Sequence, residues 1–196
     1  MRREDDIDPT RMAYEPTPGR SGLSTYDQLK DVAMPSVTLE KTMPHYAAVG
    51  RVASKWAQLE HQMQELIWGL AGLDDMTGTC ITSQIGNSGR LMDALLALLE
   101  QKGASKDELK PLHKLNEAIG DKQRMRNRIV HDPWYFHFNE DGTTTGFRLE
   151  SSAVKTVVRK LIKQDYEKLE RLIQDIESLY LQLTNLIAPW YKKPPR

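Results

Sequence analysis

The residues best suited to chemistry lie in the sequence RMRNRIVHDPW, which spans positions 124 to 134. Asn127 and His131 are four residues apart, so a helix would place them on one face, with Arg126 on the flank of that face. A guanidinium binds phosphate oxygens through paired hydrogen bonds, an imidazole moves protons near neutral pH, and an amide can orient either group. The three side chains therefore predict a site that holds a phosphate and transfers a proton.

The residues that follow predict where this helix ends. Pro133 disfavours an α conformation at Asp132, so His131 should lie at or near the helix C-terminus. The negative end of the helix dipole and the Asp132 carboxylate both favour the imidazolium form of His131. A protonated imidazole is suited to general acid catalysis. Asp132 is therefore predicted to support His131 in this role.

The basic residues around the motif have separate predicted roles. The inward, apolar face of the preceding helix gives way to Lys122 and Arg126. A lone buried guanidinium is costly, so Arg126 needs either a ligand or a carboxylate partner, for which Glu60 is the candidate. Arg124 and Arg128 share another face, where they are either solvated charge or, together with Lys122, contacts for RNA.

Other interpretations of these residues stay open at this point. The whole basic segment would also serve as a helix end that only offsets the helix dipole. His137 lies in the next predicted element, either at the surface or within reach of the site as a supporting residue. His45 and His113 are expected at the surface, and Cys80, which has no base at a readable spacing, is expected to be a packed or idle thiol.

The elements that must position the motif are predicted from apolar periodicity. Three helices are expected over residues 44–72, 88–103 and 105–131, with Pro44 in the first turn of the first one. A polar loop is expected at residues 73–86. Asn87 should cap the second helix, and Ser105 with Glu108 should form a capping box on the third.

The order of elements predicts the fold class. Residues 134–150 have the composition of a β-hairpin, and the segment after them begins ambiguously and then becomes a strong helix that ends at Pro189. This order favours an all-α, up-down helical bundle with a small β-hairpin inserted before the last helix. Three tryptophans are expected as core or dimer-interface anchors: Trp56, Trp68 and Trp134.

The domain organisation follows from the same pattern. Residues 1–43 lack periodicity and contain several prolines, which predicts a flexible N-terminal arm. Residues 44–188 form the predicted helical domain, and residues 189–196 form a C-terminal tail. Trp190 and Tyr191 in this tail lie among basic residues, so the tail either stacks on RNA or is a disordered end.

Composition limits the classes of function. The chain has 196 residues and equal numbers of basic and acidic ones, 27 each, so any nucleic-acid surface must be a local patch. The single cysteine excludes an internal disulfide and a zinc site built from cysteines, and it fits a reducing compartment. No apolar run is long enough for a membrane span, and the N-terminus does not resemble a secretory signal. A cytoplasmic protein is therefore expected.

The motif also resembles the signature of a known family. An arginine followed directly by a polar residue, with four to six residues between the arginine and a histidine at a helix end, is the pattern of the HEPN family, and it maps onto Arg126, Asn127 and His131. RNRIVHDPW is similar to the helix end of bacterial HEPN proteins, many of which have glycine where this chain has Asp132. LEHQMQELIWGLAGLD resembles their first helix, and the resemblance covers roughly residues 45 to 188.

The resemblance implies a homodimer with two motifs facing each other across a cleft, and a metal-independent endoribonuclease that needs no cofactor. His131 would be the general acid or base while the RNA 2′-OH attacks the adjacent phosphate, Arg126 would stabilise the phosphorane, and Asn127 would hold the other groups or the phosphate. Toxins and defence proteins use this chemistry, which makes an antitoxin protein a candidate partner. Other HEPN proteins are catalytically silent modules that bind RNA or a protein, and this alternative stays open.

Overall fold

The computed structural model describes residues 39–153 and 157–192. Residues 1–38 of the predicted flexible arm lie outside the described residues. The chain divides into two compact units. The helical unit contains residues 48–130 and the described chain from residue 167 to 192. The sheet unit contains the described residues up to Ala47 and residues 131–166. The described chain is mostly helical with one small sheet, which agrees with the coarse prediction of a helical bundle with a β insertion.

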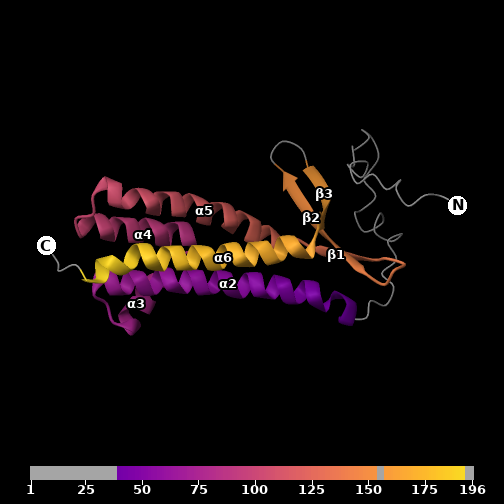
Figure 1. Ribbon diagram of the computed structural model, residues 1–196, viewed down its shortest axis with the longest axis horizontal. Coiled ribbons are helices and arrows are strands. Elements are labelled where there is room, and N and C mark those ends of the chain that lie inside the picture. The colour runs from indigo at the N-terminus through magenta and orange to yellow at the C-terminus, as the bar shows by residue number, and fades with distance from the viewer. Residues whose placement is uncertain (1–38, 154–156, 193–196) are drawn as a thin grey trace. The chain divides into compact units, whose positions relative to one another are not determined.

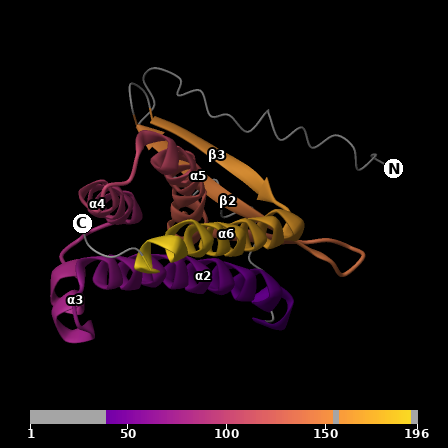
Figure 2. The same cartoon turned by 60° about the vertical axis from the view of Figure 1, so that its left-hand side comes forward.

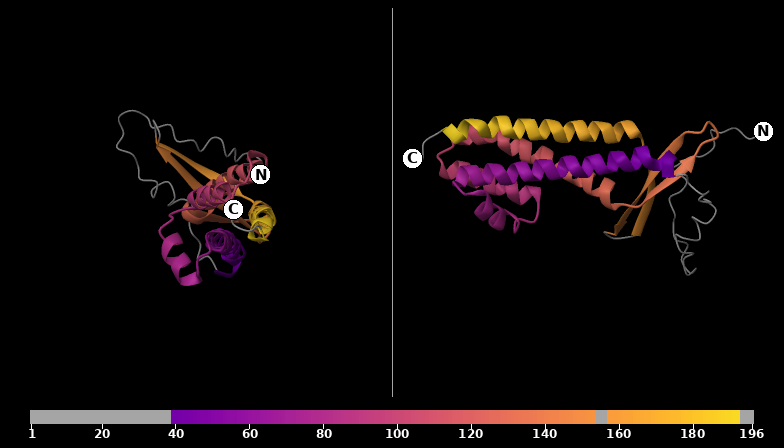
Figure 3. Two further views of the ribbon diagram at one scale, coloured as in Figure 1. Left: turned by 90° about the vertical axis from the view of Figure 1, so that its left-hand side faces the viewer. Right: turned by 90° about the horizontal axis from the view of Figure 1, so that it is seen from below.

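Helices α2 (Leu39–Ala71), α4 (Ser88–Gln101), α5 (Lys106–His131) and α6 (Tyr166–Ile187) supply the helical unit, with the short helix α3 (Asp75–Thr82) and the 3-10 turn η3 (Ala188–Lys192). Figures 1 and 3 show α2 and α6 running side by side. Two ion pairs join them: Arg51 Nη1 lies 2.7 Å from Glu170 Oε1, and Lys55 Nζ lies 2.8 Å from Glu177 Oε1.

The predicted helix ends are confirmed where local chemistry sets them. The Asn87 side chain accepts a hydrogen bond from Arg90 N at 3.0 Å. The Ser105 N–H donates to Glu108 Oε2 at 2.9 Å, and Glu108 N donates back to Ser105 Oγ at 3.3 Å, which is the reciprocal capping box. Gly103 follows α4 at φ 85°, a conformation that glycine adopts without the Cβ penalty.

The core of the helical unit is built from the predicted apolar faces. Burial of large side chains removes their surface from water, which is the main force that holds such helices together. The predicted tryptophan Trp56 is 1% exposed and the central leucines are completely buried. The largest fully buried residues are Trp56, Leu59, Met63, Leu91, Met92, Leu95, Leu99, Leu112, Ile119, Leu169, Leu172 and Ile173.

The prediction of a loop at residues 73–86 was wrong in part, because α3 occupies its centre. Its sequence DMTGTCIT has no apolar stripe, so the helix depends on its cap and on one contact. Asp74 caps it by accepting from Thr77 N at 3.0 Å. The Trp68 ring covers Gly78, and Trp68 Nε1 donates to Thr82 Oγ1 at 3.0 Å. This tertiary contact is not visible in local periodicity.

The start of α2 also differs from the prediction. The helix begins at Leu39, so Pro44 lies inside it and not in its first turn. A proline at this position removes one N–H donor close to the N-terminus, where the helix loses only a hydrogen bond to its first turn. Among the described residues, 39–153 and 157–192, no helix is long and apolar enough to cross a membrane.

The sheet unit contains a three-stranded antiparallel sheet in the order β1 (Trp134–Phe138), β2 (Thr144–Ala153) and β3 (Val157–Gln164). Figure 2 shows β2 and β3 side by side. The predicted hairpin is confirmed as β1 and β2, whereas β3 lies in the segment that read ambiguously. Its sequence VVRKLIKQ groups apolar residues in pairs and does not alternate, so the period-two signal of a strand is weak.

Candidate active site at the end of helix α5

The end of α5 lies where the sequence predicted it. His131 is the last residue of the helix, Asp132 and Pro133 follow, and β1 begins at Trp134. The helix therefore carries Arg126, Asn127 and His131 within its last two turns. Asn127 and His131 are exposed, while Arg126 is half-buried. The motif thus combines two solvent-facing groups with one cation that is partly withdrawn from water.

Arg126 is held by a neighbouring amide and by no acidic group. Its Nη1 donates to Asn127 Oδ1 at 3.0 Å, and its Nε is buried without a hydrogen-bond partner. Among the residues that the structure describes, no carboxylate forms an ion pair with Arg126, so the predicted partner Glu60 does not fill this role. No described carboxylate therefore balances the charge of this guanidinium, and its other N–H groups can donate to an anion.

The three residues predicted as RNA contacts have different surroundings. Lys122 Nζ lies 2.5 Å from Asp175 Oδ2, which ties α5 to α6 and commits the lysine to a structural ion pair. Arg124 pairs with Asp121 one turn earlier, and both side chains are well exposed. Arg128 is half-buried and has interactions of its own. Arg126 is therefore the basic residue of this segment that best fits a bound phosphate.

The supporting residue Asp132 is held from the sheet. Arg148 on β2 donates from Nη1 to Asp132 Oδ2, and its Nη2 lies 3.4 Å from Glu150 Oε2. Arg148 is buried and Asp132 is partly buried: the arginine side chain is 9% exposed and that of the aspartate is 15% exposed. Leu149 N also donates to the Pro133 carbonyl at 2.9 Å. The chain directly after His131 is therefore fixed at two points by β2.

The role of Arg148 is not predictable from its sequence neighbours. In the stretch GFRLES the arginine alternates with Phe147 and Leu149, which reads as an outward charge on a half-buried strand. The structure instead buries Arg148 opposite Trp134, because the carboxylates of Asp132 and Glu150 balance its charge. Only the strand register brings these residues together, so no local signal could have revealed the pair.

His45 is buried, which corrects the expectation that it lies at the surface. It is 8% exposed, and its ring meets the edges of Phe136 at 5.3 Å and Tyr166 at 6.4 Å between centroids. A Cβ at Gly146 would come within 3.0 Å of the imidazole, so the glycine permits this close approach. Burial lowers the pKa of His45, and its Nδ1 is buried without a partner.

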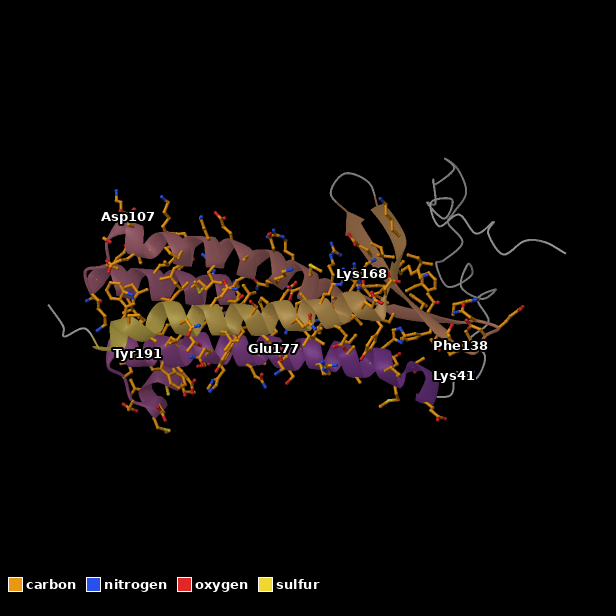
Figure 4. The ribbon with its side chains drawn as sticks, viewed as in Figure 1. Lys41, Asp107, Phe138, Lys168, Glu177 and Tyr191 are labelled. Atoms are coloured by element: carbon orange, nitrogen blue, oxygen red, sulfur yellow. The ribbon has the colours of Figure 1, made fainter. Side chains whose placement is uncertain are left out.

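The remaining candidates are distributed over several elements. His137 is exposed on β1 opposite Thr145, and His113 is exposed near the start of α5, as expected for the latter. Cys80 is an exposed free thiol in α3. Trp134 is half-buried and stacks on Phe136 with centroids 6.3 Å apart. Near the other end of β1, Lys41 Nζ lies 5.9 Å from the centroid of the Phe138 ring (Figure 4).

The aromatic residues of the predicted tail belong to the helical unit. Trp190 is 5% exposed. The Tyr191 hydroxyl donates to the Leu66 carbonyl at 3.4 Å, and a Cβ at Gly69 would lie 2.2 Å from the Tyr191 ring. Tyr191 is labelled at the end of α6 in Figure 4. Trp190 is thus buried, which does not fit stacking on RNA, whereas the Tyr191 ring contacts α2 and remains 47% exposed.

Two surface hollows on the described chain are lined by residues outside the motif. One hollow of about 410 Å³ is lined by residues of α2 and α6, and one of about 370 Å³ by residues of α4 and α5 that include His113. In residues 39–153 and 157–192 the structure contains no group of three or more histidine, cysteine, aspartate or glutamate side chains arranged to hold a metal ion.

Comparison with known proteins adds no assignment: no protein-family model, curated protein or solved structure matches this chain.

Proposed function

We propose that the protein is an endoribonuclease that cleaves RNA without a metal ion, through the HEPN-type motif of Arg126, Asn127 and His131. The observation that carries this proposal is the state of Arg126. It is half-buried, its Nε has no partner, and its Nη1 contacts an amide oxygen and no carboxylate. A cation in such a position is costly unless an anion completes it, and a phosphodiester supplies that anion.

The proposed reaction uses the 2′-OH of the RNA as its nucleophile. An imidazole acting as general base takes the proton of this hydroxyl, the 2′-oxygen attacks the adjacent phosphorus, and the bond from phosphorus to the 5′-oxygen breaks. An imidazolium then donates a proton to the leaving 5′-oxygen. The products are a 2′,3′-cyclic phosphate and a 5′-hydroxyl. His131 is exposed at the helix end, which allows it to approach either oxygen.

Arg126 and Asn127 have complementary proposed roles. The guanidinium would stabilise the charge that accumulates on the equatorial oxygens as the phosphorane forms, a preorganised electrostatic contribution. Asn127 accepts from Arg126 Nη1 and so limits the directions in which the remaining N–H groups can point. In a homodimer, two such motifs facing each other would supply one imidazole as base and one as acid.

The second candidate is a catalytically silent HEPN module that binds RNA or a protein partner. Arg126 is half-buried and His131 is exposed. This difference supports the second candidate, since a half-buried cation can bind a phosphate whether or not the exposed imidazole takes part. Within the first candidate, a role as a toxin or defence component, with an antitoxin protein as partner, rests on the resemblance to the family.

The test is incubation of the purified protein with mixed RNA in EDTA, followed by analysis of the fragment ends. Fragments with cyclic phosphate ends are expected. RNA that is bound at low salt but remains intact favours the silent module, and the absence of both binding and cleavage contradicts both candidates. Light scattering tests the homodimer: a mass near twice the 22.4 kDa of one chain is expected, and a monomer at micromolar concentration contradicts the composite cleft.

A further inference from the structure

One face of the three-stranded sheet presents a row of aromatic and cationic side chains. Tyr135 on β1 is paired with Phe147 on β2, and Phe147 is paired with Lys163 on β3. Directly paired residues of antiparallel strands lie on the same face of a sheet, so these three form one row across it. The next row on that face contains His137 paired with Thr145.

This surface, called the aromatic face below, is defined by the described side chains that the alternation places on that side of the sheet. They are Tyr135, His137, Thr145, Phe147, Leu149, Ser151, Leu161 and Lys163.

The aromatic face is the more open side of the sheet, and its charge has one sign. His137 and Lys163 are exposed, and Tyr135 and Phe147 are half-buried. The opposite side includes Arg148 and Gln164, each 8% exposed. None of the eight side chains that define the aromatic face is acidic. The surface therefore combines accessible ring area with positive potential and hydroxyl groups.

We propose that the aromatic face binds unpaired nucleotides of RNA, which makes single-stranded RNA the substrate class. This inference rests on the proposed ribonuclease function. Bases that are not paired stack on tyrosine and phenylalanine rings in a way that tolerates sequence, and cationic side chains beside the rings contact the backbone. The Tyr135–Phe147 pair provides the stacking surface, and Lys163 provides the phosphate contact in the same row.

Chain connectivity places this surface close to the motif. His131 precedes Tyr135 by four residues, and both belong to the sheet unit. Four residues of extended chain span at most roughly 14 Å, which limits the separation of the two Cα atoms. The Pro133 carbonyl accepts from Leu149 N, so the connecting segment is fixed to β2. A nucleotide stacked on Tyr135 would therefore belong to the same short stretch of RNA as the phosphate at His131.

A second copy of this chain is a less suitable occupant of the same surface. Two-fold pairing would bring the aromatic face of one subunit against the same face of the other. Lys163 of one copy would then meet a face whose defining side chains include no carboxylate. Like charges brought together in this way oppose association. A polyanion gains from the same arrangement.

The experiment measures binding of a single-stranded 2′-O-methyl oligonucleotide, which cannot be cleaved through its 2′-oxygen, at low salt. The variants are Tyr135→Leu, Phe147→Leu and Lys163→Gln. Leucine removes the aromatic ring but keeps an apolar side chain at the same position. Tyr180→Leu on α6 is the matched control, because that tyrosine is also half-exposed and lies in the helical unit. The same oligonucleotide in a duplex serves as the second probe.

We expect each ring substitution to weaken single-strand binding by about tenfold, within the range of stacking contributions, and the control to leave it unchanged. Binding should depend less on salt in Lys163→Gln, and the duplex should bind more weakly than the single strand. Equal affinity of the wild type and the ring variants overturns the inference, as does equal binding of duplex and single strand. Loss of dimerisation in the ring variants with RNA affinity unchanged also overturns it, because the face would then hold a second copy.

Failure of the two proposals can be told apart. Weaker binding in the ring variants, combined with no cleavage by the wild type, contradicts the nuclease and supports the aromatic face. Cleavage that needs His131 but is accompanied by unchanged affinity in the ring variants supports the nuclease and contradicts the aromatic face.

Discussion

The guanidinium of Arg148 holds the carboxylate of Asp132, the residue directly after the helix end at His131. An aspartate at the C-terminus of a helix faces the negative end of the helix dipole, which is unfavourable in isolation. Arg148 offsets that cost, and the buried arginine is in turn balanced by Asp132 and by the more distant Glu150. The strand β2 therefore holds the chain in place directly after His131, where Pro133 has ended the helix.

Substitution Arg148→Met should destabilise the fold strongly, because it removes one member of a largely buried ion pair, whose other member, Asp132, is 15% exposed. Removal of one member of a buried ion pair typically costs about 3–5 kcal/mol in the free energy of unfolding. Denaturant unfolding measures this quantity. Glu150→Gln is the matched control and should cost less, since that carboxylate is 3.4 Å from Arg148 and 35% exposed. Equal losses for the two variants would show that the Asp132 pair has no special role.

The free energy of unfolding should decrease as the pH falls, because of His45. Burial lowers the pKa of this imidazole below its ordinary value of 6.5, so the unfolded chain binds a proton that the folded chain excludes. Well above pH 6.5 both states are neutral and His45 contributes no pH dependence. As the pH falls below that value toward the folded pKa, the free energy of unfolding decreases. His45→Gln should reduce this dependence in unfolding measured between pH 7.5 and 5.5, and an identical slope in the variant would contradict the assignment.

Two helical glycines should respond to alanine in opposite directions. A Cβ at Gly78 in α3 would lie 2.4 Å from the Trp68 ring, so Gly78→Ala should cost about 1–3 kcal/mol through overpacking. Gly50 in α2 has no atom within 4 Å of such a Cβ, and Gly50→Ala should stabilise the helix by roughly 0.5–1 kcal/mol. Thermal unfolding distinguishes them. A stabilised Gly78→Ala variant would be inconsistent with the packing of α3 on Trp68.

Arg126 should require its planar, forked donor set and not only its charge. Arg126→Lys is expected to slow RNA cleavage by roughly tenfold or more, equivalent to about 1.4 kcal/mol, because lysine cannot bind a phosphate through two parallel hydrogen bonds. Arg124→Lys is the control: it makes the same chemical change at an exposed residue that pairs with Asp121. The measurement is the cleavage rate under single-turnover conditions, and equal rates for both variants would remove Arg126 from the proposed site.

The sequence predicted those features that depend on neighbouring residues. Ser105 and Glu108 cap α5 through contacts three residues apart, and Pro133 ends the helix at His131 for a local steric reason. The features it did not predict depend on residues brought together from a distance. Arg148 reaches Asp132 only through the register of β1 and β2, and His45 is buried only because Phe136 and Tyr166 cover it.

The candidate site shows the same division. The order Arg126, Asn127, His131 and the helix that carries it were predictable from spacing. The partner of Arg126 was not, because choosing between Glu60 and Asn127 requires knowledge of how the helices pack. The ion pair of Lys122 with Asp175 on α6 likewise depends on how the two helices pack, so it is not predictable from the residues around Lys122.

The most direct test of the account compares two histidines on the same helix. His113 and His131 are both exposed on α5, near its start and at its end, so replacing either with alanine makes the same chemical change at a surface position. The measurement is the single-turnover rate of RNA cleavage in EDTA. The account predicts that His131→Ala slows cleavage by about 10²–10⁴-fold while His113→Ala matches the wild type. Cleavage at the wild-type rate by a folded His131→Ala variant would contradict it.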